Sequence, residues 1–238
     1  FDYYPKGSLY RLYRESPRSK EGRKPLEQSW EFYALRFDPY QASHRDFFNS
    51  QILSYYMSGR NNLGLKYSAG GDYENALANY NRALSYNLDF YETYNNIGIL
   101  YYYKRDFESA LRYYSSALRH KPDEASLFYN IGLAYRELND YNKALEYLMQ
   151  IQTPSSYNEI GYIFLNLGEL DAAELKLKEA VKLNPSYEPA YYNLGLVYEK
   201  KSQYMLAEKY YKIYYDSISD PAERKQVYNK LEELRRIN

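Results

Sequence analysis

The sequence predicts an all-α solenoid, a stack of helix-turn-helix repeats, and three regularities support this. Five glycines recur at spacings of 34, 34, 29 and 34 residues: Gly64, Gly98, Gly132, Gly161 and Gly195. An alanine follows each glycine by 12 residues, and a large apolar residue follows each alanine by four. Apolar residues also recur at helical intervals on both sides of a short polar break. Such a period is typical of an array in which each repeat buries a face on the next.

The glycines and alanines predict a close crossing of the two helices within each repeat. A glycine inside a helix costs about 1 kcal/mol relative to alanine, so packing must recover that loss. The alanines are Ala76, Ala110, Ala144, Ala173 and Ala207. The large residues after them are Tyr80, Tyr114, Leu148, Leu177 and Tyr211. We therefore expect glycine on the first helix and alanine on the second to leave no bulk where the helices cross.

We place five repeats along the chain and expect one of them to be irregular. Their ranges are 57–90, 91–124, 125–153, 154–187 and 188–220. Asp72, Asp106 and Asp140 stand at the polar breaks, where each is predicted to cap the second helix. The third repeat lacks five residues near Pro154, so we expect a shortened second helix or turn. Neighbouring repeats should then stack at a different angle there.

The two ends of the chain differ from the repeats. Residues 1–24 are a basic and aromatic arm that we expect to be flexible. Residues 25–56 are predicted to form a helical hairpin, interpreted as a degenerate repeat. Residues 221–238 are predicted to form a C-terminal capping helix that covers the last repeat with the stripe Val227, Leu231 and Leu234.

Composition argues against several classes of protein. The chain has 31 basic and 31 acidic side chains, so no overall field favours nucleic acid or an anionic membrane. It has no cysteine, and no apolar run is long enough to suggest a membrane span. We find no phosphate loop, nucleophile elbow or metal-ligand spacing. We therefore expect no enzyme, no cofactor and no metal site. The sequence leaves the compartment open between the cytoplasm and a periplasmic or secreted location after processing.

The repeat pattern resembles the tetratricopeptide repeat. Residues 91–124 carry its characteristic side chains at Tyr94, Ile97, Gly98, Tyr101, Ala110, Tyr114, Ala117 and Pro122. The resemblance covers about residues 57–221. It implies a right-handed superhelical solenoid whose first helices line a concave groove, and a scaffold for protein–protein interaction. Groove positions at which some relatives bind an acidic tail hold Asn61 and Leu65 here, so such a tail is a poor match.

The resemblance also implies a set of groove residues. The sixth position of each repeat points into the groove and holds Asn62, Asn96, Asn130 and Asn193, with Glu159 in the fourth repeat. An asparagine carries both a donor and an acceptor, so it can hold the C=O and N–H groups of a bound peptide. Asparagine also simply tolerates such a partly exposed helical position. The other expected groove residues are Leu65, Ile99, Leu133, Tyr162, Leu196, Tyr102, Tyr103, Tyr129 and Arg136.

Three functions remain open at this point. The first is an adaptor that binds a peptide segment of a partner protein in the groove. The second is a structural component of a larger assembly that acts through its convex surface or its N-terminal arm. The third is an RNA-binding solenoid, because residues 6–24 hold seven basic and two acidic side chains next to tyrosines.

Overall fold

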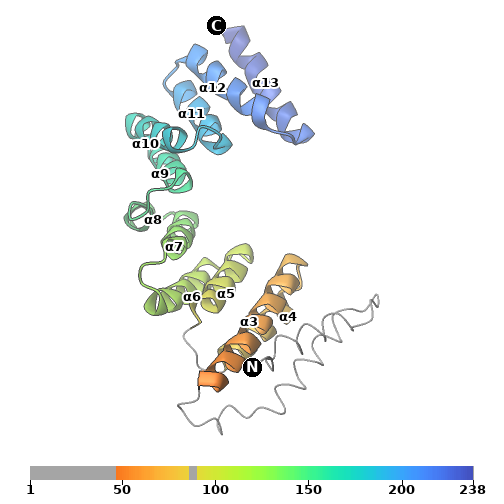
Figure 1. Ribbon diagram of the computed structural model, residues 1–238. Helices are drawn as coiled ribbons and strands as arrows, with labels where there is room; N and C mark the ends of the chain where they lie inside the picture. The colour runs from red at the N-terminus through yellow and green to blue at the C-terminus, as the bar shows by residue number, and fades with distance from the viewer. Residues whose placement is uncertain (1–46, 86–89, 238) are drawn as a thin grey trace. The chain divides into compact units, whose positions relative to one another are not determined.

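The structure is a computed structural model that describes the backbone of residues 47–85 and 90–237 (Figure 1). Within these residues all regular structure is helical, in eleven helices, which confirms the predicted all-α solenoid. The chain divides into two compact parts, Phe1–Leu88 and Asp89–Asn238. The predicted arm (1–24) and most of the predicted hairpin (25–56) lie outside the described residues.

The first part contributes α3 (Phe47–Ala69) and α4 (Tyr73–Leu84). Helix α3 has 23 residues and continues without interruption through residue 57, where we draw the start of the first repeat. No proline occurs within α3, so nothing in its sequence forces a break at that boundary.

The second part is a chain of paired helices. Its helices are α5 (Tyr91–Tyr103), α6 (Phe107–His120), α7 (Ala125–Glu137), α8 (Tyr141–Leu148), α9 (Pro154–Leu167), α10 (Leu170–Leu183), α11 (Glu188–Lys200), α12 (Tyr204–Ser217) and α13 (Pro221–Ile237). Each first helix packs against the second helix of its own repeat, and each second helix packs against the first helix of the next.

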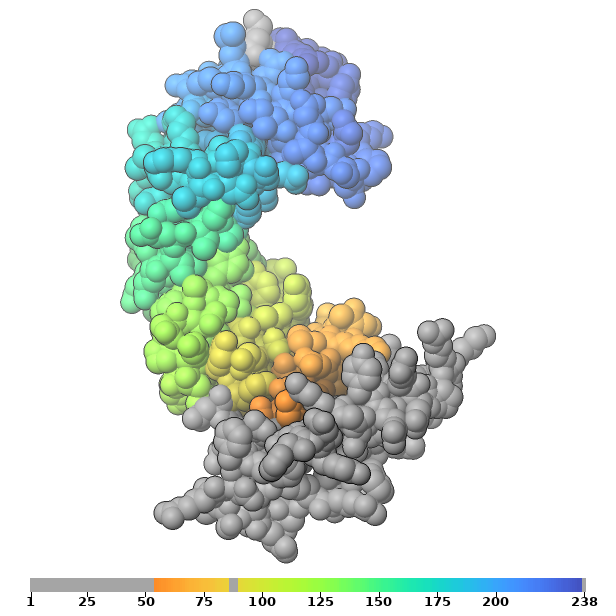
Figure 2. All heavy atoms as spheres, in the orientation of Figure 1, coloured from red at the N-terminus to blue at the C-terminus, as the bar shows by residue number. Residues whose placement is uncertain are grey.

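The first helices of the second part line its inner face. Helices α5, α7, α9 and α11 contact one another in sequence, whereas contacts between successive second helices are weaker or absent. In a curved stack the elements that lie closest together are on the inside of the curve. The space-filling view shows a hollow between α5 and the α11–α13 end of this part (Figure 2). We call the surface of these four first helices the inner face.

The glycines permit the close crossing, but the group that needs the space is not the alanine. A Cβ atom on Gly98 would lie 2.4 Å from Cε1 of Tyr114. The same relationship holds in every repeat, with Tyr80, Leu148, Leu177 and Tyr211 facing the other glycines. The second-helix alanines are fully buried beside this contact. The glycine thus makes room for the large side chain four residues after the alanine, which corrects the expectation that no bulk lies at the crossing.

The three aspartates cap their helices as predicted. Asp72 accepts a hydrogen bond from the backbone N–H of Asn75 at 3.3 Å. Asp106 accepts one from Ser109 at 3.0 Å, and Asp140 accepts one from Lys143 at 3.2 Å. Each bond satisfies an amide that has no partner within the first turn of its helix.

The five missing residues shorten the second helix of the third repeat. Helix α8 has 8 residues, whereas α6 and α10 each have 14. It also makes a smaller contact with the following first helix than α6 or α10 does. After α8 the chain turns through the buried Ile151 into Thr153, which caps α9 in a capping box with Ser156. The predicted shortening is confirmed, and the altered stacking angle stays a prediction.

Stacked tyrosines account for part of the high tyrosine content. Within three repeats the tyrosine three residues after the glycine stacks on one from the second helix. The pairs are Tyr101–Tyr113, Tyr135–Tyr147 and Tyr198–Tyr210, with ring centroids 5.3, 5.8 and 5.2 Å apart. Stacking of this kind buries the apolar area of both rings.

The C-terminal helix covers the last repeat. Val227, Leu231 and Leu234 are buried in the cluster that also holds residues of α11 and α12, which confirms the predicted stripe. Asp220 accepts hydrogen bonds from the backbone N–H groups of Ala222 and Glu223, and so caps α13. The helix thereby closes the apolar end of the stack.

Candidate functional site

Most of the predicted groove residues lie on the first helices of the second part. Asn62 and Leu65 are exceptions, because both are on α3 in the first part, where both are exposed. The site is therefore built here from α5, α7, α9 and α11 alone.

The inner face carries pairs of asparagines that join neighbouring first helices. The side-chain amide of Asn130 donates to the side-chain oxygen of Asn95 at 2.8 Å. That of Asn193 donates to the side-chain oxygen of Asn158 at 2.9 Å. Asn158 and Asn193 are buried, at 4% and 8% exposure. Two of the predicted groove asparagines therefore already hold adjacent repeats together, in addition to any contact with a ligand.

These amide pairs have a signature in the sequence. Each joins the fifth position of one repeat to the sixth position of the next, a spacing of 35 residues (Asn95 to Asn130, Asn158 to Asn193). An asparagine at the fifth position of one repeat, followed by an asparagine at the sixth position of the next, is the pattern that predicts this side-chain hydrogen bond. Asn96 is half-buried on α5 and occupies the same sixth position.

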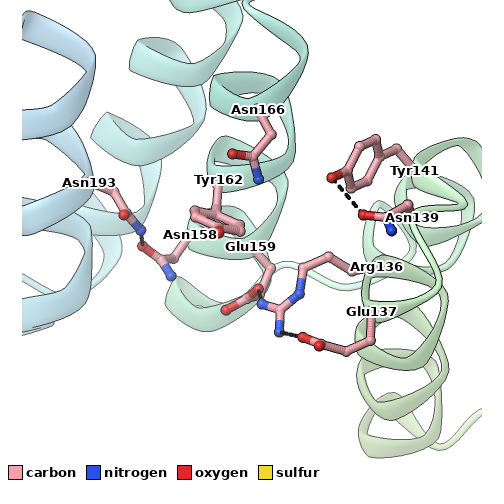
Figure 3. Close-up of a pocket in the computed structure, with 9 residues that line it drawn as sticks. All are labelled: Arg136, Glu137, Asn139, Tyr141, Asn158, Glu159, Tyr162, Asn166 and Asn193. Carbon is pink, nitrogen blue, oxygen red and sulfur yellow. Dashed lines mark hydrogen bonds and ion pairs between the residues drawn. The ribbon is translucent and has the colours of Figure 1, made fainter. Parts of the chain in front are cut away.

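The junction between the third and fourth repeats lacks such a pair and has an ion pair in its place. Here the fifth position is Tyr129 and the sixth is Glu159. The Arg136 guanidinium donates to the Glu159 carboxylate across the gap between α7 and α9 (Figure 3). Arg136 also donates to Glu137 at 2.6 Å and lies over the ring of Tyr162, 5.7 Å from its centroid. The hydroxyl of Tyr102 lies 3.5 Å from the same guanidinium.

Burial and charge pairing have opposite effects on the charged groups of this junction. It raises the pKa of the Glu159 carboxyl, and the Arg136 guanidinium and the Asn158 amide offset only part of that rise. Burial opposes the charge of Arg136, but the carboxylates of Glu159 and Glu137 raise its pKa above the usual range. Burial, followed by the nearby Glu159 carboxylate, likewise raises the pKa of Tyr129. The ion pair thus lies in a partly dehydrated environment, where electrostatic interactions between charged groups are stronger than at an open surface.

A cavity of about 340 Å³ opens at this junction (Figure 3). It is lined by Arg136, Glu137, Asn139, Tyr141, Asn158, Glu159, Tyr162, Asn166 and Asn193. Every one of these side chains carries a polar or charged group. We call this cavity the junction pocket. It lies beside the short helix α8, and three of its lining residues, Arg136, Tyr162 and Asn193, belong to the predicted groove set.

The remaining predicted residues divide into exposed and packed side chains. Tyr103 and Tyr162 are exposed, at 68% and 37%. Leu133 is half-buried on α7. Ile99 and Leu196 are half-buried too, but they pack against the core clusters of their repeats. The exposed aromatic rings and Leu133 are thus the apolar groups best placed to meet a ligand.

The part of the chain that the structure describes contains neither a metal-ion site nor a membrane-spanning helix. No group of histidine and acidic side chains there is arranged to hold a metal ion. None of the described helices is both long and apolar enough to cross a lipid bilayer.

Comparison with family models identifies the repeats. Models described as "Tetratricopeptide repeat" match residues 58–90 and 95–159, and a model described as "TPR repeat" matches residues 153–202. The chain is a tetratricopeptide-repeat protein. Proteins of this family generally mediate protein–protein interactions and generally lack enzymatic activity. Comparison with the curated proteins found no match.

Solved structures agree with this assignment at the level of the fold. PilF of Pseudomonas aeruginosa is 17% identical, with a TM-score of 0.67 over 76% of this chain and 85% of its own. PilW, described as a type IV pilus biogenesis factor, is 20% identical, with a TM-score of 0.67 over 75% and 85%. YrrB, described as having an unusual peptide-binding site, is 23% identical, with a TM-score of 0.55 over 77% and 98%.

Proposed function

We propose that this tetratricopeptide-repeat protein is an adaptor that binds a segment of a partner protein along the inner face of residues 89–238. The observation that carries the proposal is the junction pocket. Its volume of about 340 Å³ fits one or two side chains, and it opens on the face formed by the first helices. The description of YrrB as a peptide-binding protein of the same fold is consistent with such a role.

The chemistry of the inner face suits an extended or helical peptide. Exposed rings such as Tyr103 and Tyr162 supply apolar area that a ligand would bury. The amides of Asn139 and Asn166 at the pocket supply donors and acceptors for peptide groups. An adaptor of this kind needs no catalytic residue and no cofactor.

Two other functions remain as alternatives. A structural role would use the outer face, where Leu175 and Leu183 of α10 are 59% and 52% exposed. An RNA-binding role would use the basic residues of the N-terminal arm. The N-terminal arm lies outside the described residues.

Selection of peptides on the intact protein tests the proposal. Random linear peptides displayed on phage would be selected on the full chain, and the selected clones measured against variants. The double variant Leu133→Ala with Tyr162→Ala should weaken binding about tenfold or more, because it removes apolar area from the inner face. The matched control is Leu175→Ala with Leu183→Ala on α10, which should leave binding unchanged.

The rival functions give opposite results in the same assay. Loss of binding in the α10 variant, with full binding in the inner-face variant, would contradict the proposal in favour of the outer surface. Loss of binding only on deletion of residues 1–24 would favour the arm.

A further inference from the structure

We propose that the junction pocket takes one cationic side chain, a lysine or an arginine, of the bound segment. The inference rests on the proposed function and names one residue that the partner must supply. It follows from the charge, the lining groups and the position of the pocket.

The charged groups that line the pocket have a negative sum. Glu137 and Glu159 face a single guanidinium, that of Arg136. A further cation, Arg105, lies 3.9 Å from Glu137, but its side chain is 78% exposed, so solvent screens much of its charge. An incoming ammonium or guanidinium would therefore balance a pocket whose lining holds two carboxylates and one half-buried cation, Arg136.

The uncharged lining groups also favour a cation. Asn139 and Asn166 offer side-chain oxygens, and the Asn139 oxygen accepts a hydrogen bond from the Tyr141 hydroxyl at 3.1 Å. The ring of Tyr162 already lies beside one guanidinium, that of Arg136. Carboxylate and amide oxygens next to an aromatic face are groups that bind lysine and arginine side chains.

Other side chains fit the pocket less well. An acidic residue would bring a third carboxylate beside Glu137 and Glu159, with only Arg136 to balance them. An apolar residue would displace water from polar lining groups and leave them without partners, which costs free energy for each group.

The position of the pocket makes this preference local. At the junctions before and after it, asparagine side chains form hydrogen bonds between the first helices, Asn95 with Asn130 and Asn158 with Asn193. Only at this junction of the second part does a carboxylate, that of Glu159, replace the sixth-position asparagine. We therefore expect a preference for a cation at one position of the bound segment, with little charge preference at its neighbours.

A synthetic peptide library with one fixed position tests the inference. Four sub-libraries carry lysine, arginine, norleucine or glutamate at a central position, with mixed residues on both sides, and are captured on the full-length protein. The lysine and arginine sub-libraries should be enriched about tenfold over norleucine, and glutamate should be depleted. In Glu159→Gln, which keeps the shape but removes one charge, the enrichment should fall to about twofold or less.

Two further variants serve as controls. Glu146→Gln removes the same charge from an exposed position on α8 that does not line the pocket, and the cation preference should survive it. Glu137→Gln removes the other lining carboxylate and should reduce the preference in part. It tests the inference independently if Glu159→Gln proves unstable in a thermal melt.

The outcomes separate this inference from the proposed function. Capture of peptides that depends on Leu133 and Tyr162 but shows no cation preference would overturn the inference alone. A cation preference that persists in both Glu159→Gln and Glu137→Gln would also overturn it. Failure to capture any sub-library would contradict the proposed function, and the inference with it.

Discussion

The side-chain amide of Asn193 on α11 donates a 2.9 Å hydrogen bond to the side-chain oxygen of Asn158 on α9, one repeat earlier in the chain. Both side chains are largely buried, at 4% and 8% exposure, and both also line the junction pocket. The inner face is thus joined by amide pairs as well as by apolar packing, and this has a measurable consequence for stability.

We expect Asn193→Ala to lower the free energy of unfolding by about 1–3 kcal/mol, because it leaves the buried oxygen of Asn158 without its donor. The matched control is Asn142→Ala, at an exposed position of α8, which should change it by less than about 0.5 kcal/mol. Urea denaturation of both variants provides the measurement. Equal stability of the two variants would show that the amide pair contributes nothing.

Gly98→Ala should destabilise the protein although alanine is the better helix former. The new Cβ would lie 2.4 Å from Cε1 of Tyr114, whose side chain is only 1% exposed and has little room to move. Overpacking of this kind typically costs about 1–3 kcal/mol. In a Tyr114→Ala background the obstructing ring is absent, so the same change should be neutral or stabilising. Thermal melts of the wild type, the two single variants and the double variant test this. If Gly98→Ala lowers the Tm in both the wild-type and the Tyr114→Ala backgrounds, the explanation is refuted.

Acidification should remove the stabilisation that Glu174 provides. Burial acts to raise the pKa of this carboxyl, but hydrogen bonds from Lys178, Lys201 and Tyr198 outweigh it and lower the pKa to about 2. Since the pKa is lower in the folded state than in the unfolded state, the stabilisation is present above about pH 4.5. It is lost as the pH falls from there toward 2.

Thermal melts of the wild type and of Glu174→Gln provide the measurement for this pH dependence. The wild type should have the higher Tm at pH 6, and the difference should shrink steadily by pH 3. Tyr198→Phe, which removes one of the three hydrogen bonds, should show a smaller effect of the same sign. A difference between wild type and Glu174→Gln that does not change with pH would contradict this assignment.

Helix α8 should be the least protected second helix of the second part in hydrogen exchange. It has 8 residues, and it packs less extensively on the following repeat than α6 or α10 does. Local opening requires less free energy where few buried contacts are lost. Exchange measured by mass spectrometry should therefore be faster in 141–148 than in 107–120 or 170–183. Equal protection of the three helices would mean that the short repeat is as firmly packed as its neighbours.

Much of the fold could be predicted because its signals are local or strictly periodic. The spacing of Gly64, Gly98 and the later glycines established the repeat, and each aspartate at a break lies within four residues of the amide it caps. The shortened repeat was visible as a gap of 29 residues instead of 34. The stripe of Val227, Leu231 and Leu234 likewise needs only the helical period.

The candidate site was predicted less completely. Arg136 and Tyr162 were expected in the groove, but Glu159 was treated only as the exception to a line of asparagines. That line was interpreted as free for a ligand, whereas Asn130 and Asn193 also bond to the preceding repeat. The small glycines and alanines predict helices that cross without bulk, whereas the space beside each glycine is filled by the large side chain four residues after the alanine.

The sequence by itself determined the repeat period, its one shortened interval, and the chemical groups available on each first helix. The tertiary structure alone decided which of those groups meet. The amide pairs, the ion pair of Arg136 with Glu159 and the junction pocket all depend on how one first helix lies against the next. That placement is fixed by packing across the whole junction, including the length of α8, and no single repeat contains enough information to specify it.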